Sequence, residues 1–158
     1  MVLLDLDQLT KSAQVIVIGT VLASEARWEK QHTDIGTITT VEVSTYLKFR
    51  DSRPGRIYLR HPGGNPPVFQ EKLWSMNVDG VPEFKQGQRG MFFLQKRGRF
   101  FELVGWVQGL FEINKTLSGQ EIAARRLDGV FFVNKLRDSI PPEMTLNQLV
   151  SEVKRRLQ

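Results

Sequence analysis

The residues from Thr39 to Phe49 limit the possible folds more than any other part of the sequence. Hydrophobic or threonine side chains alternate with mostly polar ones along the whole stretch. Since successive side chains of a β-strand point to opposite faces, this period of two predicts one long, half-buried strand. The face predicted to point inward carries Thr39, Val41, Val43, Thr45, Leu47 and Phe49.

Further strand signals lie on both sides of this stretch. The run Val15–Ala23 is rich in β-branched residues, which suit a strand buried on both faces. Gly19 within it predicts a bulge or a sharp bend. Ile57 and Leu59 alternate with polar residues and predict a short strand after a turn at 53–55. Other strands are predicted at 91–94, 100–104, 109–113 and 130–133, with a short one within 68–76.

Helices are predicted at both ends of the chain. Asp5 is a suitable N-cap for a short helix over 5–13. Thr145 and Gln148 have the spacing of a capping box, which predicts the start of a C-terminal helix over about 144–157. The apolar residues of this helix recur at helical spacing and form one stripe: Leu146, Leu149, Val150, Val153 and Leu157.

Together these elements predict a mainly β chain that forms a single domain over 1–158. Short strands with helices only at the ends favour a small closed or nearly closed antiparallel barrel over about 14–134. Its expected type is OB-like (oligonucleotide/oligosaccharide-binding), and a sandwich of two sheets is the alternative. Phenylalanines occur as adjacent pairs, so one ring of each pair must point outward, where we expect the C-terminal helix to cover it. The pairs are Phe92-Phe93, Phe100-Phe101 and Phe131-Phe132.

Composition narrows the class of protein further. Hydrophobic residues make up 41% and charged residues 25% of the chain, the balance of a globular domain. Cysteine is absent, which excludes disulfides, zinc–thiolate sites, iron–sulfur clusters and cysteine nucleophiles. No apolar run approaches the roughly 20 residues that a membrane-spanning helix needs. The net charge of +5 is mildly basic and does not by itself indicate an anionic partner.

A series of short motifs runs through the chain between about residues 5 and 134. The motifs are Val15–Val21, Trp28, Val41–Val43, Leu47-Lys48, Pro62–Gly64, Pro82–Phe84, Gly87, Phe93-Leu94 and Gly105–Phe111. Their order resembles an uncharacterised domain of exported bacterial proteins and is loosely similar to the netrin-like modules of the tissue inhibitors of metalloproteinases. The resemblance implies a barrel and export. Because the chain has no cysteine, the inhibitory N-terminal cysteine of those modules has no counterpart here.

The sequence contains no recognisable catalytic or metal-binding motif. His32, Asp34 and His61 lack the spacing of a metal site, and no Gly-x-Ser-x-Gly elbow is present. Carboxylates such as Glu102 and Glu112 fall at outward strand positions, where a solvated or cross-strand-paired role is the default. We therefore predict that the protein is not an enzyme and holds no metal or cofactor.

Two loop regions carry the candidate binding residues. The adjacent glycines of Pro62–Asn65 permit positive φ angles and close backbone approach, and they can form an anion-accepting nest, although a tight connection between strands is favoured. Trp28 and Trp74 lie in or beside polar loops, where each either caps the barrel or is exposed for binding, with capping favoured. The predicted partner-binding residues are Trp28, Arg60, His61, Gly63, Gly64 and Trp74.

We expect a non-enzymatic binding module that contacts a protein or a cell-envelope polymer through loops at one barrel end, as a monomer or a homodimer. The resemblance implies export although the first residues lack a signal-peptide pattern, and a cytoplasmic location is the alternative. A second hypothesis is a barrel that binds single-stranded nucleic acid. A third is a hydrolase with an unrecognised site. The nucleic-acid hypothesis rests on three clusters of basic residues, Lys96–Arg99, Arg125-Arg126 and Lys154–Arg156.

Overall fold

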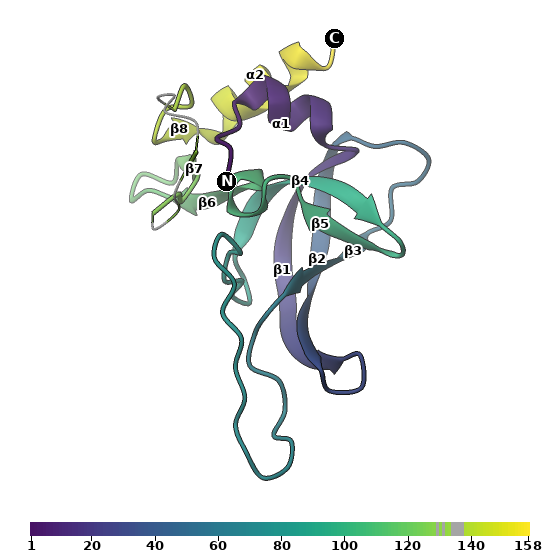
Figure 1. Ribbon diagram of the computed structural model, residues 1–158. Coiled ribbons are helices and arrows are strands. Elements are labelled where there is room, and N and C mark those ends of the chain that lie inside the picture. Colours follow the sequence, from purple (N-terminus) through teal and green to yellow (C-terminus); the bar gives the residue numbers. More distant parts are fainter. Residues whose placement is uncertain (129, 131, 134–137) are drawn as a thin grey trace.

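The computed structural model describes residues 1–128, 130, 132–133 and 138–158 (Figure 1). It is mainly β, with a short helix near the N-terminus and a second helix at the C-terminus, as the sequence predicts. In chain order the elements are α1 (Leu6–Ser12), β1 (Val15–Glu29), β2 (Asp34–Lys48), β3 (Arg56–Pro62), β4 (Arg89–Arg97), β5 (Phe100–Leu103), the 3-10 helix η1 (Trp106–Gly109), β6 (Leu110–Lys115), β7 (Glu121–Ala124), β8 (Met144–Thr145) and α2 (Leu146–Arg156).

Five of the strands close into a ring. Their order is β1-β2-β3-β5-β4, and Arg89–Leu94 of β4 pairs back with Val15–Thr20 of β1. The strands β6, β7 and β8 continue the same sheet from β4, so the eight strands form one sheet rather than the two of a sandwich. The prediction of an antiparallel arrangement is wrong at one place, because β3 and β5 pair in parallel, at Leu59 and Phe101.

The strands β1 and β2 form a long, curved hairpin of 15 residues each (Figure 1). β1 runs to Glu29 rather than to Ala23, because its second half pairs with the first half of β2. The register shifts beside Gly19, which confirms the predicted bulge. A Cβ atom at Gly19 would lie 2.6 Å from the carbonyl oxygen of Glu42, so the two strands can approach this closely only at a glycine.

The predicted alternation of β2 holds as far as Val43 and fails beyond it. Ser44 is skipped in the pairing with β1 and forms a bulge. Because a bulge inverts the alternation, Tyr46 contacts the same interior cluster as Val43, whereas Thr45 is exposed. Phe49 lies past the end of the strand and is 42% exposed. The inward face predicted from the sequence is therefore wrong at Thr45 and Phe49, and at Leu47, which packs against the cluster between the sheet and the helices.

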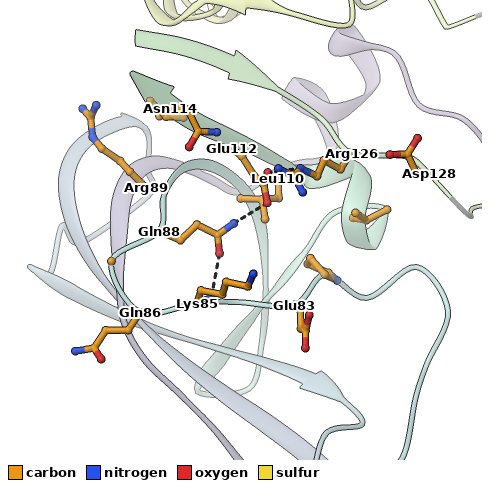
Figure 2. A pocket seen from close by; sticks show the side chains of 14 residues that line it. Glu83, Lys85, Gln86, Gln88, Arg89, Leu110, Glu112, Asn114, Arg126 and Asp128 are labelled. Atoms are coloured by element: carbon orange, nitrogen blue, oxygen red, sulfur yellow. Dashed lines mark hydrogen bonds and ion pairs between the residues drawn. The ribbon is translucent and has the colours of Figure 1, made fainter. Parts of the chain in front are cut away.

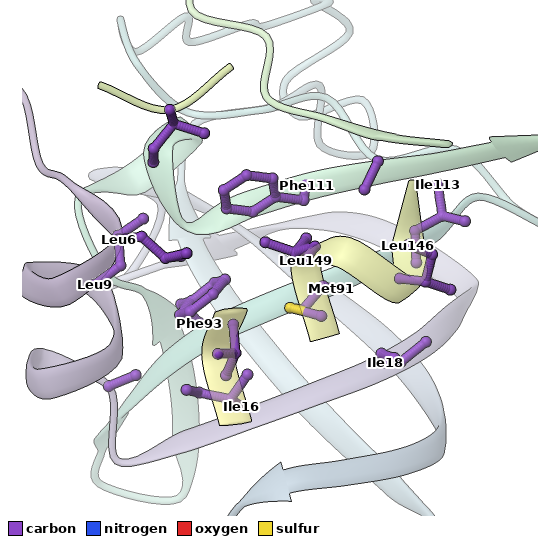
Figure 3. Close-up of a cluster of buried hydrophobic side chains, with 14 of the residues drawn as sticks. Leu6, Leu9, Ile16, Ile18, Met91, Phe93, Phe111, Ile113, Leu146 and Leu149 are labelled. Carbon is purple, nitrogen blue, oxygen red and sulfur yellow. The ribbon is translucent and has the colours of Figure 1, made fainter. Parts of the chain in front are cut away.

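Two clusters of buried side chains meet at β4. Phe92 belongs to the cluster inside the ring, whereas Phe93 belongs to the cluster between the sheet and the helices (Figure 3). Leu149 and Val153 of α2 are fully buried in that second cluster, and the ring of Phe93 lies 5.6 Å from that of Phe111. This confirms the predicted cover by the C-terminal helix for the pair Phe92-Phe93. It is wrong for Phe100-Phe101, because the Phe100 ring lies under Arg27 and Arg99 instead.

Both helices begin with the predicted caps. The Asp5 carboxylate accepts a hydrogen bond from the backbone N–H of Gln8 at 2.8 Å. The Thr145 hydroxyl accepts one from the backbone N–H of Gln148 at 3.1 Å, which completes the predicted capping box. Among the described residues, no helix has the length and apolar character needed to cross a membrane.

Two of the weaker strand predictions do not match the structure. Residues 68–76 form only isolated bridges, Phe69↔Lys72 and Gly64↔Met76. The strand expected at 130–133 lies partly outside the described residues, and its described members are not in a strand. Conversely, β7 and β8 were not expected, because their few residues carry no sustained alternation.

Candidate binding surface at the distal end

The predicted binding residues lie at the end of the molecule away from the helices, which we call the distal end (Figure 1). It comprises the tip of the β1–β2 hairpin, the end of β3 and the loop 63–76. Trp28 is the second-last residue of β1, and Arg60 and His61 are near the end of β3. Because β3 pairs with Gly36–Glu42 of β2, the loop that follows β3 starts beside the hairpin tip.

Four rings form an aromatic cluster at the distal end. The ring of His32 stacks on that of Phe69 at 3.9 Å, and Trp28 lies 5.4 Å from His32 and 5.5 Å from Phe69. Trp74 meets Trp28 edge-on at 5.9 Å. Both predicted tryptophans thus come together. Instead of a tryptophan, Phe84 covers the distal side of the ring interior, stacked 6.3 Å from Phe92.

The loop 63–76 contains a tight turn at residues 69–72. Phe69 and Lys72 exchange two backbone hydrogen bonds of 3.3 and 3.2 Å around Gln70 and Glu71, whose φ angles of +53° and +59° are those of a two-residue hairpin turn. Phe69 turns inward to the aromatic cluster. The side chains next to Phe69 and Lys72 are largely exposed to solvent: Val68 is 60%, Leu73 87% and Trp74 43% exposed.

The indole N–H groups of both tryptophans are already paired. Trp28 donates from Nε1 to the carbonyl oxygen of Pro67 at 3.0 Å, and Trp74 donates to that of Phe69 at 3.1 Å. The first bond ties the loop to the hairpin tip, and the second closes the loop on itself. What Trp74 still offers to a partner is therefore the apolar part of its ring.

An ion pair connects the hairpin tip to β3. Arg60 donates to the Glu29 carboxylate, and Arg27 lies 3.5 Å from its other oxygen. The hydrogen bond from Arg60 holds the pKa of Glu29 below its ordinary value, against the opposing effect of burial. Gly36 leaves the space that this carboxylate fills. Arg60 therefore holds the hairpin against β3 and is not a free cation.

The two adjacent glycines make the connection between β3 and the loop. Gly63 and Gly64 have φ angles of +92° and +122°. Their N–H groups donate to the carbonyl oxygens of Ile35 and Met76, at 2.9 and 2.8 Å, so neither is left to bind an anion. Thr37 donates from its hydroxyl to the Gly63 carbonyl at 2.7 Å. The glycines therefore form the favoured tight connection between β3 and the loop, and their amides do not form an anion-binding nest.

His61 faces a hollow of about 340 Å³ between the hairpin and the loop. Its ring lies 5.2 Å from that of Phe84. Burial, followed by the neighbouring charge of Arg60, lowers the pKa of His61 from 6.5 to about 4. The imidazole is therefore neutral near pH 7.

Lowering the pH from about 6.5 to 4 is expected to destabilise the protein by about 2 kcal/mol through His61. In this window the unfolded chain binds a proton at His61 that the folded chain does not, so the free energy of unfolding falls as the pH falls. Urea titrations of wild type and His61→Gln at several pH values would measure the difference. A difference that does not change between pH 7 and 4 would contradict it; a His32→Gln variant controls for loss of a histidine.

The two histidines do not form a common site. His32 stacks in the aromatic cluster, whereas His61 packs against Phe84. Within residues 1–128, 130, 132–133 and 138–158, no three histidine, aspartate or glutamate side chains gather in a way that could hold a metal ion.

A larger groove, of about 650 Å³, lies between the segment before β4 and the strand β6 (Figure 2). Three of its polar side chains, Gln88, Glu112 and Arg126, pair with one another. Glu112 accepts a hydrogen bond from Gln88 Nε2 at 2.9 Å and forms an ion pair with Arg126 at 2.7 Å. Arg89 pairs with Glu121. These bonds engage Gln88, Glu112 and Arg126 inside the groove, whereas the distal end presents large exposed apolar side chains, and we therefore take the distal end as the candidate.

Sequence reasoning missed several residues of the distal end. Val68, Phe69 and Leu73 lie in an irregular segment with no periodicity that would reveal which side chains are exposed. Neither models of known protein families nor curated proteins gave a match to the chain. The distal end is therefore interpreted from its own geometry and chemistry.

Proposed function

We propose that the protein is a non-enzymatic binding module that engages a partner through its distal end. One observation carries this proposal: Leu73 and Val68 are largely exposed on a turn that the aromatic cluster and two indole hydrogen bonds hold in place. Val68 and Leu73 flank the bridged pair Phe69–Lys72 and so lie next to each other, and grouped apolar side chains on a surface mark an interaction site more than a single one does.

The fold supports this location if the ring is an OB-like barrel, which we also propose. The strand order β1-β2-β3-β5-β4, closed by a parallel β3–β5 pair, fits a five-stranded Greek-key ring. Barrels of that type bind ligands on the face of strands 2 and 3 and with the loop between strands 1 and 2. Here that loop is the hairpin tip, which carries His32 of the aromatic cluster.

We favour a partner bound by apolar contacts over nucleic acid, because other side chains already cover the faces of several aromatic rings. Stacking on bases requires free ring faces. The Phe100 ring, however, has the guanidinium groups of Arg27 and Arg99 over it at 5.5 and 5.1 Å, and Phe69 is stacked on His32. The aliphatic side chain of Leu73 gives nucleic acid no specific contact. Export of the module remains part of the proposal.

A matched pair of leucine variants tests the proposal. Leu117 is also fully exposed, but it lies on the β6–β7 turn, away from the distal end. Immobilised wild type, Leu73→Ser and Leu117→Ser would be compared for what each retains from a total cell extract that includes membranes. We expect Leu73→Ser to lose most of the retained material and Leu117→Ser to keep it. Equal retention by the two variants would contradict a role of the distal end.

Strong, salt-sensitive retention of single-stranded oligonucleotides that Leu73→Ser leaves unchanged would favour the nucleic-acid alternative instead.

A further inference from the structure

We infer that the partner of the distal end is a lipid surface, into which the segment 66–74 inserts shallowly with Leu73 as its main anchor. This inference rests on the proposed function, because it assigns a partner to the same surface. Three properties of the segment support it: its size and shape, the pairing of its polar groups, and its charge.

The exposed apolar surface is small and projects from the molecule. It consists of Val68, Leu73 and Trp74, and Figure 1 shows the loop reaching beyond the hairpin tip. A stable protein interface buries about 800 Å² on each partner, much more than three side chains on a projecting turn provide. Insertion into the boundary of a bilayer needs only a few apolar side chains and no complementary shape. The shape therefore favours lipid over protein.

Several polar groups at the centre of this segment are paired within the protein and would keep their partners on insertion. Burying an unpaired N–H or C=O group in lipid is costly. Here the turn is closed by the mutual bonds of Phe69 and Lys72, and the indole N–H of Trp74 is bonded to the Phe69 carbonyl. Tryptophan is also the side chain most typical of membrane–water boundaries.

The charges at the distal end nearly balance. The Glu29 carboxylate is paired with Arg60 and Arg27, and Lys30 lies 3.7 Å from Asp34. On the turn itself, Glu71 stands beside Lys72. Binding should therefore be driven by apolar insertion and depend little on anionic lipid. Because Glu71 lies in the turn, insertion is limited to the headgroup boundary.

Vesicle partitioning tests the inference with defined probes. Wild type, Leu73→Ser and Leu117→Ser would be sedimented with large vesicles of phosphatidylcholine alone and of an equal mixture with phosphatidylglycerol. We expect wild type to bind both, with a blue shift of tryptophan emission. Leu73→Ser should lower the partition coefficient about tenfold or more, as expected for one buried leucine, and Leu117→Ser should leave it unchanged. Circular dichroism would verify that each variant is folded.

A second variant addresses the orientation of the turn. Glu71→Lys is expected to strengthen binding to the phosphatidylglycerol vesicles several-fold and to change binding to phosphatidylcholine little, because the new charge would face the headgroups.

The outcomes separate this inference from the proposed function. If no vesicle binds wild type, or if both leucine variants lose binding equally, the lipid inference is overturned. If Leu73→Ser nevertheless loses the material retained from extract, the distal end binds a protein and the proposed function stands. If Leu73→Ser changes neither measurement, both fail.

Discussion

Replacing Phe93 by alanine is expected to lower the free energy of unfolding by about 3–5 kcal/mol, because it removes a fully buried ring from the cluster that joins the sheet to both helices. Phe93 lies on β4 next to Phe111 and in the same buried cluster as Leu149 of α2 (Figure 3). The cavity would lie between rigid elements that cannot close around it. Urea denaturation followed by circular dichroism would measure the loss.

Phe100→Ala provides the control. Phe100 also belongs to an adjacent phenylalanine pair, but its ring is only half buried and lies beneath Arg27 and Arg99. We expect a loss of about 1 kcal/mol, mainly from these cation–π contacts. Similar losses for the two variants would show that the helices do not form a common core with the sheet.

Replacing Gly64 by alanine is expected to destabilise the protein by about 2–4 kcal/mol and to loosen the distal end. The φ angle of +122° is unfavourable for any residue with a side chain. In addition, the new Cβ atom would lie 2.5 Å from the Thr37 hydroxyl and 2.7 Å from the Cβ atom of Ala26. The loop would have to move away from the hairpin, and with it Trp74.

Gly55→Ala is the matched glycine control. A Cβ atom there meets no atom within 4 Å, and we expect a change within about 0.5 kcal/mol. Besides the free energy of unfolding, the tryptophan emission reports on the Trp28–Trp74 contact. A Gly64→Ala protein with wild-type stability and emission would contradict the close packing of the loop against the hairpin.

The sequence predicted the elements whose signal is local and repeated. The capping pairs Asp5–Gln8 and Thr145–Gln148 and the apolar stripe of α2 were correct, because each depends on residues a few positions apart. The two-sided burial of β4 was also foreseen, since adjacent phenylalanines must face opposite sides.

What the sequence did not predict depends on contacts between distant segments. The parallel pair of β3 and β5 joins Leu59 to Phe101, and no local pattern encodes its direction. The structure brings the predicted binding residues together at the distal end, but several of them are engaged by other parts of the protein. Arg60 is engaged by Glu29, and the glycine amides are engaged by Ile35 and Met76. Leu73 was missed because its exposure results from the turn at Gln70 and Glu71.

The side chains of the distal end pack mainly on each other and not on the core, and this has an evolutionary consequence. The rings of Phe69 and Trp74 find their contacts with Trp28 and His32, whereas the two core clusters are built from other side chains. Substitutions at exposed positions of the turn therefore change the stability of the sheet and its two core clusters little. The sequence of such a loop can change while the ring of five strands stays the same. Proteins that share this ring can therefore differ in what they bind.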